Sequence, residues 1–167
     1  MSENKRCLNV AVLTVSDTRT AENDTSGDAL AHLLEQDNHT VFARAIVKDD
    51  VYKMRAQVSQ WIADENIQAI LTTGGTGFYN RDSTPEALGI LFDKNIDGFG
   101  ELFRHLSYQE IGTSTIQSRA IAGLANRTVV FCVPGSTGAC KTAYNGIISE
   151  QLNSTHKPCN FIGALNL

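Results

Sequence analysis

The chain has 167 residues, of which 42% are apolar and 19% are charged, and this length predicts one domain over residues 1–167 with a sizeable core. Its 18 acidic and 14 basic residues give a net charge of −4, which excludes a basic surface for general nucleic-acid binding. No apolar run approaches membrane-spanning length, so neither a nucleic acid nor a membrane is expected as a partner.

The polar N-terminus leads directly into an apolar segment and shows no signal peptide. The four cysteines are scattered, without a Cys-x-x-Cys pair and without nearby clustered histidines, which is typical of reduced thiols. We therefore expect a cytoplasmic protein that has no cysteine–histidine zinc site.

Apolar runs alternate with segments of helical periodicity through the first part of the chain. The predicted strands lie at residues 8–15, 41–47 and 67–73, and the predicted helices follow Thr25, Asp50 and Pro85 and span residues 97–107. Strands that alternate with helices predict an α/β protein, a three-layer α/β/α fold with a mainly parallel sheet.

The pattern changes after Gly112. Residues 120–124 and 129–133 are predicted as two strands, and the short polar connection between them favours an antiparallel hairpin. A final helix is predicted from about residue 139 to residue 152. The polar tail after Ser154 is expected to be extended.

Polar clusters follow four of the predicted strands. They are Ser16-Asp17-Thr18, Asp49-Asp50, the segment from Gly74 to Asp82, and Pro134 to Thr137. In an open parallel sheet, ligands bind outside the carboxyl ends of the strands. We therefore expect these four loops to converge on one rim and to form a binding site there.

The loop after residue 73 is rich in glycine and threonine: Gly74, Gly75 and Gly77 surround Thr76, and Arg81 and Asp82 follow. Glycines allow backbone N–H groups to approach a ligand closely, so the segment favours an anion cradle. It lacks the Gly-Lys-Ser/Thr ending of a P-loop and the dinucleotide-binding glycine pattern. The alternative interpretation is a tight turn from strand to helix.

Two acids on the expected rim have structural and functional interpretations. Asp49 is either an N-terminal acid of the following helix or a metal ligand. Asp82 is either a partner of Arg81, an acid that stabilises the loop, or a metal ligand. Taken together, two carboxylates would hold a magnesium ion against phosphates, because magnesium takes one or two carboxylates plus phosphate oxygens and water.

Several segments resemble the molybdenum cofactor biosynthesis family, in order and over nearly the whole chain. They are residues 13–18, 24–27, 72–77, 81–87 and 134–136. The Gly-Gly-Thr-Gly segment followed by Arg-Asp and Thr-Pro-Glu is the most specific of them. Residues 98–101 and 111–120 are similar to the B branch of that family.

The resemblance implies a molybdopterin-binding-like fold and an adenylyl transfer, in which molybdopterin and ATP give adenylylated molybdopterin and pyrophosphate. It implies that Asp49 and Asp82 are the catalytic residues and hold Mg2+. The substrate-binding residues that it implies are Ser16, Asp17, Ser26, Gly27, Thr73, Gly74, Gly75, Thr76, Gly77, Arg81, Ser118, Pro134, Gly135 and Ser136.

The family also implies a homo-oligomer, a trimer or a hexamer, and contacts with other molybdenum cofactor synthesis proteins. Two alternatives to the enzyme stay open. One is a catalytically silent module of the same fold that binds molybdopterin or assists assembly. The other, which rests on fold analogy alone, is an unrelated nucleotide-binding regulator.

Overall fold

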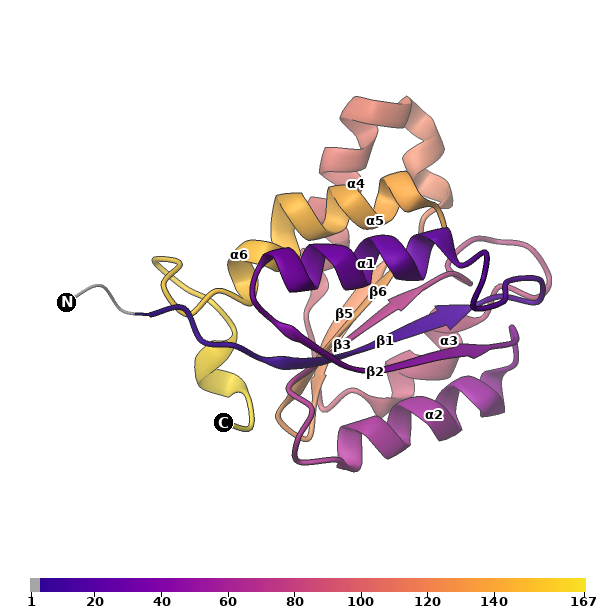
Figure 1. The fold of residues 1–167 in the computed structure, drawn as a ribbon. Helices are drawn as coiled ribbons and strands as arrows, with labels where there is room; N and C mark the ends of the chain where they lie inside the picture. The colour runs from indigo at the N-terminus through magenta and orange to yellow at the C-terminus, as the bar shows by residue number, and fades with distance from the viewer. Residues whose placement is uncertain (1–3) are drawn as a thin grey trace.

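The computed structural model describes residues 4–167, and its centre is a six-stranded sheet (Figure 1). The strands are β1 (Asn9–Val15), β2 (Thr40–Val47), β3 (Ala69–Thr73), β4 (Lys94–Asn95), β5 (Ile121–Ala125) and β6 (Thr128–Val133). Their order across the sheet is β2-β1-β3-β6-β5-β4. The first four strands in that order are parallel, whereas β5 is antiparallel to both of its neighbours. The predicted mainly parallel sheet and the hairpin are confirmed.

Helices cover both faces of the sheet and complete the three layers (Figure 1). The helices are α1 (Thr25–Gln36), α2 (Val51–Ala63), α3 (Thr84–Leu88), α4 (Asp97–Ile111), α5 (Thr137–Ala143) and α6 (Ser149–Gln151), with a π-helical turn, Tyr144–Ile148, between the last two. The helices α1, α4 and α5 lie on one face, and α2 and α3 lie on the other.

The sheet has a hydrophobic cluster on each face because its strands are buried on both sides. Along β1, Val10 and Val12 join the cluster beneath α1, α4 and α5, while Ala11 and Leu13 join the cluster against α2 and α3. This alternation follows from the two-residue period of a strand. The unbroken apolar run that predicts a central strand is therefore divided between two cores.

Four details differ from the sequence-based prediction. The helix after Pro85 ends at Leu88 and continues only as a 3₁₀ turn, while α4 extends beyond residue 107 to Ile111. The two-residue strand β4 was not predicted. The tail after Ser154 is not extended: it folds back in a short 3₁₀ turn and buries Ile162 and Leu165, because these apolar side chains complete one core cluster.

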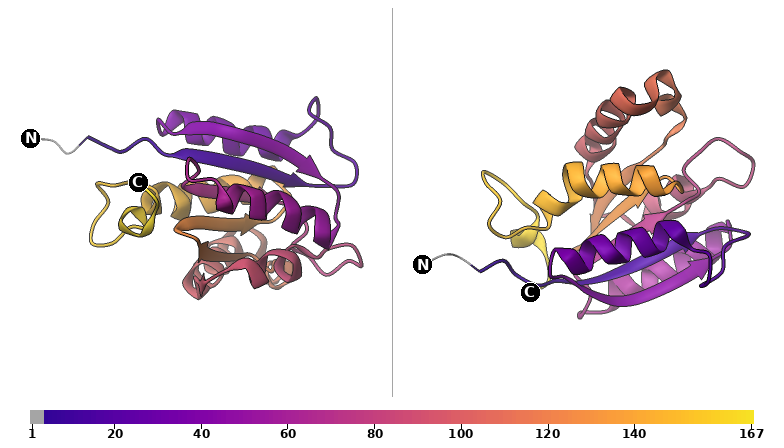
Figure 2. Two further views of the ribbon diagram at one scale, coloured as in Figure 1. Left: turned by 90° about the horizontal axis from the view of Figure 1, so that it is seen from below. Right: turned by 45° about the horizontal axis from the view of Figure 1, so that its top comes forward.

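Figure 2 shows that α4 projects beyond α5, so that its far end lies away from the sheet. The 3₁₀ segment Gly112–Gln117 continues from this end and returns the chain toward β5. Within residues 4–167, no helix combines the length and the apolar character that crossing a membrane requires.

Candidate functional site

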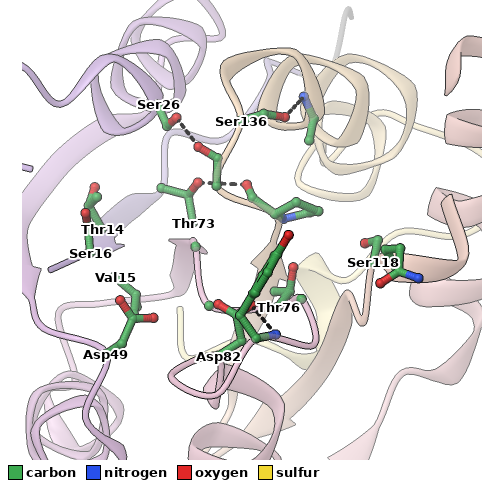
Figure 3. Close-up of a pocket in the computed structure, with 18 of the residues that line it drawn as sticks. Thr14, Val15, Ser16, Ser26, Asp49, Thr73, Thr76, Asp82, Ser118 and Ser136 are labelled. Carbon is green, nitrogen blue, oxygen red and sulfur yellow. Dashed lines mark hydrogen bonds between the residues drawn. The ribbon is translucent and has the colours of Figure 1, made fainter. Parts of the chain in front are cut away.

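The carboxyl ends of the four parallel strands open into one cavity of about 460 Å³ (Figure 3). Its lining comes from four loops and from the wall formed by α4 and the segment after it: Thr14, Val15, Ser16, Arg19, Asp24, Ser26, Asp49, Thr73, Gly74, Gly75, Thr76, Gly77, Tyr79, Asp82, Phe103, Ser107, Ile111, Ser114, Gln117, Ser118, Pro134, Gly135, Ser136 and Ala139. The predicted convergence of the four loops is confirmed.

Of the residues predicted to bind substrate or metal, all line this cavity except Asp17, Gly27 and Arg81. Gly27 lies in the first turn of α1, and its N–H donates to the carboxylate of Asp24 at 3.0 Å. Asp17 and Arg81 lie together at the rim, where Arg81 forms a two-point ion pair with Asp17. The alternative that Asp82 is the partner of Arg81 is therefore wrong.

The glycine loop requires its glycines at two positions. Gly74 and Gly75 have φ angles of +106° and +71°, which disfavour any residue with a side chain. A Cβ atom at Gly75 would lie 2.3 Å from the hydroxyl oxygen of Thr84. That hydroxyl is buried and donates to the Gly74 carbonyl at 2.8 Å, so the loop is closed onto the start of α3.

The two predicted catalytic acids come from separate strands and line the same cavity. Asp50, not Asp49, caps α2, since its carboxylate accepts from the N–H groups of Tyr52 and Lys53. This arrangement leaves Asp49 free of the capping role. Asp82 accepts a hydrogen bond from the N–H of Tyr79 at 3.1 Å, which fixes its carboxylate beside the loop.

Burial raises the pKa of Asp49, and the negative charges of Asp17 and Asp82 raise it further. The carboxylate is thus held in an excess of negative charge, an environment that a cation would relieve. In the described part of the chain, no group of three or more histidine, cysteine, aspartate or glutamate side chains could hold a metal ion. Two carboxylates fit magnesium, whose remaining ligands would be phosphate oxygens and water.

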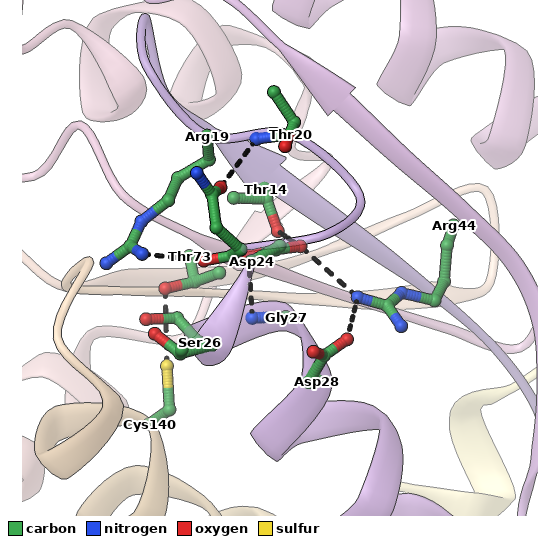
Figure 4. Close-up of polar contacts among 12 residues, drawn as sticks. Thr14, Arg19, Thr20, Asp24, Ser26, Gly27, Asp28, Arg44, Thr73 and Cys140 are labelled. Carbon is green, nitrogen blue, oxygen red and sulfur yellow. Dashed lines mark hydrogen bonds and ion pairs between the residues drawn. The ribbon is translucent and has the colours of Figure 1, made fainter.

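A further acid, Asp24, was not among the predicted site residues. It is 1% exposed, and its carboxylate accepts hydrogen bonds from the Thr14 hydroxyl at 2.7 Å and from the Arg44 guanidinium at 3.2 Å, as well as from the N–H of Gly27 (Figure 4). These bonds stabilise a buried charge at the N-terminus of α1. The sequence signal was the N-cap pattern of residues 24–27, which does not distinguish a cap from a cavity wall.

The hydroxyl groups of the site differ in whether they can still donate a proton. Ser26 and Thr73 donate to the carbonyl oxygens of Gly135 and Pro134, at 2.6 and 2.9 Å, so their protons already hold the last loop in place. By contrast, the Ser136 hydroxyl oxygen accepts from the Ala139 N–H at 3.1 Å and keeps its own proton.

Ser16 also accepts backbone hydrogen bonds, from Thr18 and Arg19 at 3.2 and 3.1 Å. Among residues 4–167, its proton has no closer acceptor than the Thr18 hydroxyl at 3.5 Å. The buried Ser118 hydroxyl has no partner within residues 4–167. The hydroxyls of Ser16, Ser118 and Ser136 can therefore donate to a bound anion.

The wall provided by α4 and the following segment was missed by the sequence analysis. It presents Phe103, Ser107, Ile111, Ser114 and Gln117 to the cavity. The amphipathic pattern of residues 97–107 predicts a helix but gives no sign of which residues face a ligand. Phe103 and Ile111 add apolar surface to the cavity, and Ser107, Ser114 and Gln117 add polar groups.

Comparison with known proteins gives consistent matches over most of the chain. Residues 11–154 match a family model described as a probable molybdopterin binding domain. Molybdenum cofactor biosynthesis protein B of Escherichia coli is 54% identical over 152 residues, which are 91% of this chain and 89% of that protein.

Solved structures agree with the sequence matches. A crystal structure of molybdenum cofactor biosynthesis protein B has a TM-score of 0.87 and 45% identity, and the match covers 90% of this chain and 94% of the other. The tungsten cofactor synthesizing protein MoaB from Pyrococcus furiosus has a TM-score of 0.77 and 36% identity, covering 87% and 92% of the two chains.

Proposed function

The chain belongs to the molybdenum cofactor biosynthesis family, and on that premise we propose that it is a molybdopterin adenylyltransferase. It uses ATP with magnesium to adenylylate molybdopterin, and it releases pyrophosphate. The observation that carries the proposal is the pair Asp49 and Asp82, which come from different strand ends yet line one cavity beside the glycine loop.

The reaction is a nucleotidyl transfer between two phosphate-bearing substrates. The terminal phosphate of molybdopterin attacks the α-phosphorus of ATP; a new P–O bond forms while the bond to the bridging oxygen breaks, and pyrophosphate leaves. Because a phosphate monoester is already anionic at neutral pH, no protein group has to accept a proton. The protein therefore acts by positioning the reactants and by balancing charge.

The residues of the cavity have different roles in this reaction. Asp49 and Asp82 would hold magnesium, which would supply positive charge to offset the negative charge of the phosphates. The loop with Gly74, Gly75 and Gly77 brings backbone N–H groups close to a phosphate. Its position is fixed by the bond from Thr84 to the Gly74 carbonyl.

The test is incubation of the protein with ATP, magnesium and molybdopterin, followed by measurement of pyrophosphate and of adenylylated molybdopterin. We expect both products in equal amounts, and we expect neither without molybdopterin. The matched control is the double variant Asp49→Asn, Asp82→Asn, which keeps the size of both side chains. Molybdopterin binding without either product from the wild-type protein would reject the enzyme and favour a binding or assembly module.

A further inference from the structure

The charge of the cavity is poorly matched to the phosphates of both proposed substrates. Among the described residues that line it, three are acids, Asp24, Asp49 and Asp82, and only Arg19 is basic. Metal binding accounts for two of the acids, and Asp24 is paired with Arg44. The single basic side chain of the lining, Arg19, is left as the positively charged protein contact for a phosphate, beside the neutral N–H and hydroxyl donors of the loops.

Arg19 also differs from three other arginines near the site, which form ion pairs with carboxylates. Arg81 is paired with Asp17, Arg119 with Glu86, and Arg44 with both Asp24 and Asp28. Within residues 4–167, no carboxylate lies within ion-pair distance of Arg19. Its guanidinium donates instead to a neutral group, the carbonyl oxygen of Asn23, at 2.6 Å (Figure 4).

The loop that carries Arg19 is held in place before any ligand binds. The N–H of Arg19 donates to the hydroxyl of Ser16 at 3.1 Å, and the N–H of Thr20 donates to the side-chain oxygen of Asn23 at 2.8 Å. The bond from the guanidinium to the Asn23 carbonyl closes this turn through the side chain. A guanidinium has five N–H donors, so most of those of Arg19 stay available, and little conformational freedom is lost on binding.

We propose that Arg19, together with the free hydroxyl proton of Ser16, binds a phosphate group of a substrate in this cavity. The inference rests on the proposed function for the identity of the ligand, which is either the triphosphate of ATP or the terminal phosphate of molybdopterin. Arg19 is thus a binding residue for a phosphate dianion, separate from the acid pair that holds the metal. Nothing in the motifs of the glycine loop indicated this residue.

The experiment compares wild-type protein with Arg19→Gln and Arg19→Lys, using Lys94→Gln as the control that removes one positive charge from the distant, exposed strand β4. Calorimetric titration with magnesium–ATP alone and with molybdopterin alone measures each affinity without turnover. Thermal melting checks that each variant is folded, which we expect because Arg19 is exposed.

We expect Arg19→Gln to weaken one of the two ligands by about tenfold to a hundredfold, as for loss of a charge-assisted hydrogen bond, with Arg19→Lys intermediate and Lys94→Gln unchanged. A loss for ATP assigns Arg19 to the nucleotide, and a loss for molybdopterin assigns it to the pterin phosphate. The affinity of Arg19→Gln for that ligand should also depend less on salt than that of the wild type.

Wild-type affinity of folded Arg19→Gln for both ligands would overturn the inference. The outcome is distinguishable from failure of the proposed function. If the wild-type protein releases no pyrophosphate, but Arg19→Gln binds one of the ligands more weakly, the protein is not the adenylyltransferase and the phosphate site at Arg19 still stands. If Arg19→Gln forms product at the wild-type rate and binds both ligands with unchanged affinity, the protein is the adenylyltransferase but has no phosphate site at Arg19.

Discussion

The guanidinium of Arg119 donates two hydrogen bonds to the carbonyl oxygen of Gly77, from Nε at 3.0 Å and from Nη2 at 2.7 Å. The same group donates to the Asp82 carbonyl at 3.3 Å, pairs with Glu86, and lies 5.0 Å from the centre of the Phe78 ring. The position of the glycine loop is thus fixed by a residue from the segment that precedes β5, far along the chain.

Arg119→Lys should therefore loosen the glycine loop. An ammonium group cannot reproduce the planar fork that binds Gly77 and Glu86 at once. We expect a stability loss of about 1–3 kcal/mol in urea unfolding, together with slower pyrophosphate release. Glu86→Gln is the milder control, because its exposed ion pair contributes roughly 1 kcal/mol or less. Equal effects of the two variants would show that the bonds to Gly77 do not hold the loop.

Asp82→Asn should slow adenylyl transfer without abolishing pterin binding. The change keeps the size of the side chain but removes a charge that holds the metal, and loss of such a contact costs on the order of 3 kcal/mol, or about a hundredfold in rate. Adding Asp49→Asn should cost less than the sum of the single losses, because both remove the same ion. Turnover at the wild-type rate by Asp82→Asn would contradict the magnesium site.

Asp49→Asn should stabilise the metal-free protein at neutral pH. The folded-state pKa of Asp49 is raised, by burial and then by Asp17 and Asp82, so its ionised form disfavours the fold. The resulting decrease in the free energy of unfolding is absent below the unfolded-state pKa of about 3.9, and it develops as the pH rises through the folded-state pKa. In thermal unfolding from pH 3 to pH 7, the melting temperature of the variant should thus exceed that of the wild type by an amount that grows with pH. A variant melting below the wild type at pH 7 would contradict this.

Substitutions of two glycines should separate folding from function. In Gly77→Ala, the new Cβ would lie 2.7 Å from the Asp82 carboxylate, so we expect displacement of that acid and weaker use of magnesium, with little change in melting temperature. Gly75→Ala should instead lower stability by about 1–3 kcal/mol, because its φ is +71° and its Cβ would meet the buried Thr84 hydroxyl. Melting curves and magnesium titrations of both variants distinguish the two effects.

The chain should form a homo-oligomer, for which a trimer or a hexamer is the expectation from the family. The apolar side chains of the segment predicted as a helix over residues 97–107 are Phe99, Leu102, Phe103 and Leu106. Of these, Phe99 and Phe103 are buried within the monomer, whereas Leu102 is 44% exposed. Further exposed apolar side chains lie at the projecting end of α4 and just beyond it, where Ile111 and Ile116 are 55% and 68% exposed. Sedimentation at micromolar concentration should show species larger than 18.2 kDa. A purely monomeric profile would contradict the expectation, and Ile116→Ser, which lies outside the cavity lining, should weaken the assembly.

The sequence alone determined the α/β architecture and the edge of the sheet at which the binding loops meet. Apolar runs separated by helical periodicity are local patterns, and they predict parallel strands whose carboxyl ends meet at one edge. Asp49, Asp82 and the glycine loop could therefore be assigned to one site before any distance was known. The hydroxyl residues Ser16 and Ser136 followed from the same rule.

Only the tertiary structure decided the partners of the charged side chains. Arg81 could pair with Asp82, its neighbour in sequence, but the fold brings it to Asp17, 64 residues away. In the same way, Arg119 reaches Gly77 across 42 residues, and Arg19 is left without a carboxylate among the described residues. Such pairings depend on distances set by the order of strands across the sheet. A local pattern gives no measure of those distances, so the charge balance of the cavity emerges only when the chain is folded.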